Sequence, residues 1–80
     1  MIDERCKNYL YDLGFLLKEY ALEAKAERDQ HRGSEDASYY TGVLMAFHRI
    51  ISLMQQQAIA FGIPLEDLQL DDIDPDQTLV

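Results

Sequence analysis

An apolar seven-residue repeat runs without a break through the second half of this 80-residue chain. Its positions alternate at spacings of four and three: Tyr40, Leu44, Phe47, Ile51, Met54, Ala58 and Phe61. This period matches one face of an α-helix, and no proline interrupts it. A flanking row of Val43, Ala46, Ile50, Leu53 and Ala60 widens the apolar surface to about half of the helix circumference. The repeat therefore predicts one long helix over residues 35–61.

Local signals indicate where this helix begins and ends, and a second helical pattern precedes it. Ser34 is a suitable N-cap, and Gly62 followed by Pro64 is typical of a helix end. Upstream, one spaced row predicts a helix over residues 3–32 with these side chains on its buried face: Ile2, Cys6, Tyr9, Leu13, Leu16 and Tyr20. Gly33 separates the two predicted helices.

Two long helices joined by a short loop form an antiparallel hairpin, so we expect an all-α fold over residues 1–63. Residues 64–80 form an acidic tail with six acidic residues and no basic one. Two alternatives stay open for this tail. Its leucines and Ile73 either pin it to the hairpin after a short turn, or it remains a loose, solubilising extension.

The second predicted helix has an unusually uncharged surface. Arg49 is the only formally charged residue between Ala37 and Ile63, whereas an exposed helix usually carries several charges. We therefore predict a C2 homodimer in which two hairpins form a four-helix bundle with the second helices at its centre. Gly42 and Ala46 would permit a close helix crossing there, and the alternative is that these two residues only pack against the tail. The predicted dimer interface comprises Tyr40, Gly42, Val43, Ala46, Phe47, Ile50, Leu53 and Met54.

A separate apolar patch lies on the first predicted helix, almost opposite its stripe. Tyr11, Phe15 and Leu22 share one helical side and are bordered by charged residues. Aromatic residues with a charged rim are typical of a protein-binding hot spot, although the dimer mate or the tail is an alternative cover for them. The predicted partner-binding residues are Tyr11, Phe15, Lys18, Glu19, Leu22 and Glu23.

Residue types that support metal binding or catalysis are few. Cys6, His31 and His48 share no helical face, which argues against a zinc site. Cys6 belongs to the predicted buried stripe, where a thiol is normally inert. The aspartates of residues 72–76 lack the glycine and the glutamate of a calcium-binding loop, and no glycine-rich phosphate loop is present. We expect no metal, no cofactor and no enzymatic activity.

The overall charge and the single cysteine limit the partners and the compartment. Fifteen acidic and seven basic residues give a net charge of -8, which opposes binding to nucleic acid. The N-terminal residues do not resemble a signal peptide, and the most apolar window, 43–61, contains too many polar residues for a membrane span. One cysteine without an intrachain partner favours a reducing compartment, so we expect a cytoplasmic protein.

These features favour a non-enzymatic protein-binding module, specifically a small acidic inhibitor of the toxin-immunity or anti-defence type. Such a protein acts by contact with another protein, and its acidic charge suits a basic enzyme as the target. The main alternative is a structural or chaperone-like adaptor whose dimer holds a partner helix in an apolar groove. A third hypothesis is an enzyme subunit that shares a site between chains through Glu19, Glu23 and His48.

Overall fold

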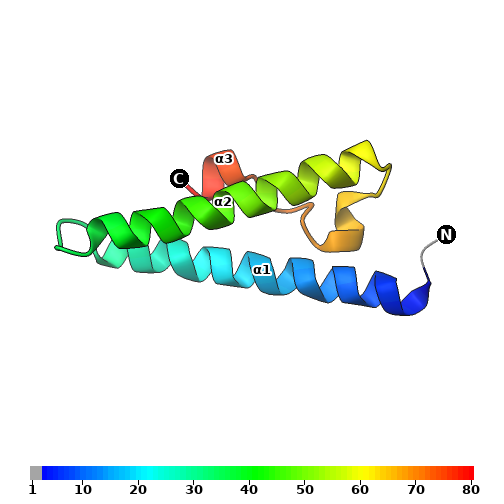
Figure 1. Ribbon diagram of the computed structural model, residues 1–80, viewed down its shortest axis with the longest axis horizontal. Helices are drawn as coiled ribbons and strands as arrows, with labels where there is room; N and C mark the ends of the chain where they lie inside the picture. The colour runs from blue at the N-terminus through cyan, green and yellow to red at the C-terminus, as the bar shows by residue number, and fades with distance from the viewer. Residues whose placement is uncertain (1–2) are drawn as a thin grey trace.

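The computed structural model describes residues 3–80 as two long antiparallel helices with a shorter segment packed along them (Figure 1). Helix α1 spans Glu4–Gln30 and helix α2 spans Ala37–Ala60. A 3-10 turn, η1, spans Leu65–Leu68, and a short helix, α3, spans Pro75–Thr78. The predicted all-α hairpin is confirmed, and the ends of both long helices lie within two residues of the predicted ones.

The ends of the long helices follow from local hydrogen bonding. The Asp3 carboxylate accepts a hydrogen bond from the backbone amide of Cys6, which satisfies one of the unpaired donors at the start of α1. Gly62 follows the last turn of α2 with φ +70°. The Ile63 amide then donates to the Ala58 carbonyl at 2.8 Å, as in a Schellman motif. Glycine is required there because positive φ is costly for residues with a Cβ.

The loop between α1 and α2 differs from the prediction at Ser34. This residue does not cap α2; its hydroxyl donates to the His31 carbonyl at 2.7 Å and closes the loop, so that α2 begins at Ala37. Gly33 adopts φ +80°, as expected for a residue that ends α1. The His31 ring stacks on Tyr40 with ring centroids 3.8 Å apart, which links the end of α1 to the start of α2.

The hydrophobic core lies between the hairpin and the acidic tail. The largest fully buried side chains are Leu44 and Ile51 from α2 and Leu70 and Leu79 from the tail. Since half of these side chains come from residues 64–80, the tail is part of the folded structure. Of the two alternatives that the sequence left open, the structure shows the tail pinned to the hairpin.

The inward face of α1 is not the stripe that the sequence predicts. Tyr9 and Tyr20 of that stripe are 66% and 52% exposed, whereas the small residues Gly14, Ala21 and Ala24 are buried. Small side chains let the neighbouring backbone approach α1 closely, and large ones would hold it away. Cys6 and Leu16 of the predicted stripe are also exposed, so the prediction that the Cys6 thiol is buried is wrong. Leu13 is half-buried, and Ile2 lies outside the described residues.

The inward face of α2 follows the predicted repeat more closely. Leu44, Ile51 and Ala58 are buried, and Phe47 and Met54 pack against the core while partly exposed. The repeat fails only at its last position, where Phe61 is the exposed C-cap residue of α2.

The backbone of η1 approaches α1 closely at Gly14. A Cβ atom built on Gly14 would lie 1.8 Å from the carbonyl oxygen of Leu68, so the backbone of η1 rests directly on α1. The other glycine inside a long helix, Gly42 of α2, has no atom of the chain within 4 Å of such a Cβ. The two glycines therefore have different roles, although both have ordinary helical backbone angles.

Gly14→Ala is expected to destabilise the protein. Alanine is favoured over glycine in a helix by about 1 kcal/mol, but the clash with the Leu68 backbone costs about 1–3 kcal/mol or more. Chemical denaturation followed by circular dichroism measures the net effect. Gly42→Ala is the matched control, and we expect it to maintain or raise stability because the chain leaves open space around it. Equal stabilisation by both substitutions would contradict the contact between η1 and α1.

Candidate protein-binding surfaces

The acidic tail occupies the groove on one side of the hairpin and runs back from η1 towards α3 (Figure 1). Five polar side chains of the long helices hold it there, and two of them, Lys25 and Arg28 of α1, donate to the Val80 carbonyl. Lys18 of α1 donates to the Gln69 carbonyl at 2.9 Å and to the Asp72 carboxylate at 2.8 Å. His48 Nε2 of α2 lies 3.0 Å from the Asp76 carboxylate, within hydrogen-bond distance.

Gln55 of α2 is another of these anchors. Its side-chain amide donates to the backbone carbonyls of Leu70 at 3.0 Å and Ile73 at 2.8 Å. An irregular segment that packs against a core must find partners for its own backbone groups, and Gln55 supplies two of them. Among residues 3–80, no buried side-chain nitrogen or oxygen atom lacks a hydrogen-bond partner.

Ion pairs concentrate at two aspartates. The Lys18 ammonium beside Asp72 holds the pKa of that carboxyl below its usual value of 3.8. The pKa of Asp29 is also lowered, chiefly by its hydrogen bond to Arg28, with Arg32 and Lys25 adding to the effect. Four of the chain's seven basic residues therefore pair with these two carboxylates. Most other acidic side chains of residues 3–80 make no ion pair within the chain.

Tyr11, Phe15 and Leu22 form one exposed surface on α1, which we call the aromatic patch. These side chains are 39–48% exposed, so the tail borders the patch without covering it. Of the other residues predicted to bind a partner, Glu19 and Glu23 are exposed and make no ion pair with residues 3–80. Lys18 is only 13% exposed because it holds the tail, although its ammonium also lies 6.0 Å from the Phe15 ring.

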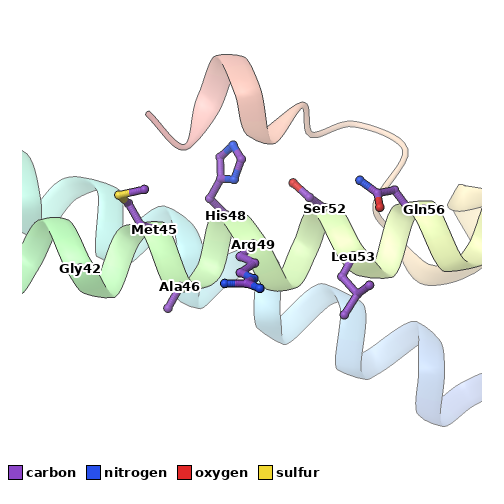
Figure 2. A pocket seen from close by; sticks show the side chains of 8 residues that line it. All are labelled: Gly42, Met45, Ala46, His48, Arg49, Ser52, Leu53 and Gln56. Atoms are coloured by element: carbon purple, nitrogen blue, oxygen red, sulfur yellow. The ribbon is translucent and has the colours of Figure 1, made fainter.

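A second surface lies on the side of the hairpin opposite the tail. On α2, Phe47 and Met54 face inward, and the residues that follow them, His48 and Gln55, contact the tail. Each residue turns the helix by about 100°. Ala46 and Leu53, which come directly before Phe47 and Met54, therefore point to the side of the hairpin opposite the tail. Figure 2 shows these two side chains projecting away from the tail, whereas His48 projects towards it.

Helix α1 follows the same rule. Leu17 is half-buried, the following residue Lys18 holds the tail, and the preceding residue Leu16 is exposed. The resulting surface, which we call the bare face, combines one row from each helix. Its members are Cys6, Tyr9, Leu13, Leu16 and Tyr20 of α1 and Tyr39, Ala46, Ile50 and Leu53 of α2. The sequence pattern does not predict this surface, because it places the α1 row in the core.

The residues predicted for the dimer interface divide into two groups. Gly42, Ala46, Ile50 and Leu53 are exposed, and the last three belong to the bare face. Tyr40, Val43, Phe47 and Met54 are half-buried within the hairpin. An open groove follows the outer side of α2 beside the bare face (Figure 2). Its lining includes the small residues Gly42, Ala46 and Ser52 and the larger Met45, Arg49 and Leu53.

Within residues 3–80, no three His, Cys, Asp or Glu side chains lie close enough together to hold a metal ion. No helix in this part of the chain is long and apolar enough to cross a membrane. Comparisons with protein-family models, curated proteins and solved structures find no match to this chain. The two exposed apolar surfaces are therefore the features of this chain that point to a function.

Asp72→Asn is expected to lower stability at neutral pH, and the loss is expected to disappear in acid. Because the pKa of Asp72 is lower in the folded chain, its contribution is fully present above 3.8 and is lost as pH falls through the lowered value. Urea unfolding of the wild-type protein and the variant, from about pH 7 to about pH 3, measures this difference.

Asp71→Asn is the matched control, because Asp71 is an exposed neighbour that makes no ion pair with residues 3–80. A stability difference for Asp72→Asn that persists unchanged into acid would show that the Lys18 contact does not hold the tail.

Proposed function

We propose that this chain is a non-enzymatic protein-binding module, a small acidic inhibitor of the toxin-immunity or anti-defence type that acts by contact with a basic enzyme. The observation that carries the proposal is the aromatic patch. Tyr11, Phe15 and Leu22 are large side chains left exposed beside carboxylates in a chain with net charge -8. Aromatic anchors with a polar rim dominate the binding energy of many protein interfaces.

The charges around the patch favour a basic target. Lys18, the nearest basic side chain, is neutralised by Asp72, whereas Glu19 and Glu23 are exposed on the same helix. A negative rim accelerates the encounter with a positively charged surface. Burial of Tyr11 and Phe15 in the complex then slows dissociation, which is the step that usually determines affinity.

We further propose that the module is a homodimer in which two hairpins form a four-helix bundle. The support for this arrangement is the bare face, since a two-helix layer with one apolar side needs a second layer to cover it. The aromatic patch lies on another side of α1, so that dimerisation leaves it accessible to a target.

A structural or chaperone-like adaptor is the second candidate function. The open groove along α2 favours it, because Met45 is largely exposed there beside small residues and flexible methionines suit adaptable packing against a partner helix. Recovery of many apolar helical proteins, rather than one basic enzyme, would favour the adaptor over the inhibitor.

The double substitution Tyr11→Ala with Phe15→Ala tests the inhibitor proposal. The full-length chain is used to capture a partner from the source cells, and the partner must be a basic enzyme whose activity falls when the purified chain is added. We expect the double variant to weaken binding by at least about 100-fold, because two hot-spot side chains are removed. Its melting temperature should change little because both side chains are substantially exposed.

Ile59→Ala is the control, since Ile59 is an exposed apolar residue of α2 outside the aromatic patch and the bare face. The control should bind the partner as tightly as the wild-type chain. Unfolding of the double variant would show that the patch belongs to the core, and undiminished binding would place the contact elsewhere. Magnesium-dependent nucleotide hydrolysis lost in Glu23→Gln would instead favour the enzyme-subunit hypothesis.

A further inference from the structure

We infer that a second copy of this chain docks on the bare face and that α1 supplies about half of that interface. This inference rests on the homodimer in the proposed function and identifies its surface. In the predicted dimer only α2 contributed, because the row Tyr9, Leu16 and Tyr20 was placed in the core. The structure turns this row outward on the same side as Ile50 and Leu53 of α2.

The size of the bare face matches what a stable dimer needs. Its six large exposed members are Tyr9, Leu16, Tyr20, Tyr39, Ile50 and Leu53. A side chain of this size at about half exposure presents on the order of 100 Å². Together with the smaller residues between them, these side chains present on the order of 800 Å², about what each partner contributes to a standard protein interface.

The charge distribution favours a second copy over a basic protein as the occupant. The members of the bare face carry no formal charge, and the charged residues beside it have both signs: Glu23 follows Leu16 by seven residues on α1, and Arg49 lies between Ala46 and Leu53 on the outer side of α2 (Figure 2). A two-fold interface places identical surfaces near one another, which is favourable only where like charges are absent. The bare face has no excess of one charge in a chain of net charge -8, whereas the aromatic patch has an acidic rim.

The rest of the described chain leaves the bare face uncovered. Residues 64–80 are held in the groove on the opposite side by Lys18, His48 and Gln55.

The test is the mass of the full-length chain in solution, measured by light scattering and sedimentation at micromolar concentration. We expect about twice 9.3 kDa for the wild-type protein. Leu53→Asp and, separately, Leu16→Asp should each weaken the dimer by at least about 100-fold, because the charge is buried at two symmetry-related positions. Both side chains are substantially exposed in the single chain, so helicity by circular dichroism should be preserved.

Ile59→Asp is the matched control, because it introduces the same charge at a 69% exposed apolar position of α2 outside the bare face. It should remain dimeric. A monomeric wild-type protein, or loss of the dimer in Ile59→Asp as well, would overturn the inference. A dimer that survives Leu16→Asp would also overturn it, because the interface would then not involve α1.

These results are separable from the fate of the proposed inhibitor function. A monomeric wild-type chain that binds its enzyme target through Tyr11 and Phe15 would overturn the dimer alone. A monomer that instead binds a synthetic amphipathic helix, with the complex lost in Leu53→Asp, would assign the bare face to the adaptor's partner helix and overturn the second-copy inference. A wild-type dimer that depends on Leu16 and Leu53 supports the inference whether or not an enzyme target is found.

Discussion

The contact between the Leu68 carbonyl and Gly14 determines the position of the entire C-terminal segment. Because α1 has no Cβ at this position, the backbone of η1 comes down directly on the helix. The chain then leaves η1 inside the groove, where Leu70 and Leu79 become fully buried. Lys18 can reach the Gln69 carbonyl and Asp72 only because the turn lies this close to α1. The ion pair and the core contacts of the tail thus depend on the space that the missing Cβ of Gly14 leaves for the η1 backbone.

Filling only one side of the hairpin explains why the molecule has a bare face. A two-helix hairpin has two open sides between its helices, and the tail is long enough to cover one of them. A small chain buries a limited fraction of its apolar surface, and the remaining large side chains must face solvent or a partner. Here the side opposite the tail retains Tyr9, Leu16 and Tyr20 from α1. The tail therefore defines the proposed interface by occupying the other side.

The sequence predicted the features that depend on local chemistry and missed those that depend on close approach. The hairpin, the helix-ending glycines Gly33 and Gly62, and the inward face of α2 follow from hydrophobic period and capping. On α1, the predicted stripe, the aromatic patch and the row of small residues could each face the core. Hydrophobicity favours a row with large side chains. The fold instead buries the row with Gly14 and Ala21, because small residues admit a neighbouring backbone. A sequence pattern ranks the rows of a helix by their apolar content, and it contains no direct measure of how closely another backbone, here that of η1, approaches the helix.

The same helix separates two surfaces with different chemistry. The bare face is broad, its members are uncharged, and the charged residues beside it, Glu23 and Arg49, have opposite signs, which suits a symmetric contact in which like groups meet. The aromatic patch is small and borders the exposed carboxylates Glu19 and Glu23, which suits an asymmetric contact with a surface of opposite charge. If two chains meet through the bare face, the tails and the aromatic patches remain outside the interface. Each copy then presents its own patch, so that self-association and target binding use different parts of α1 and do not compete for the same side chains.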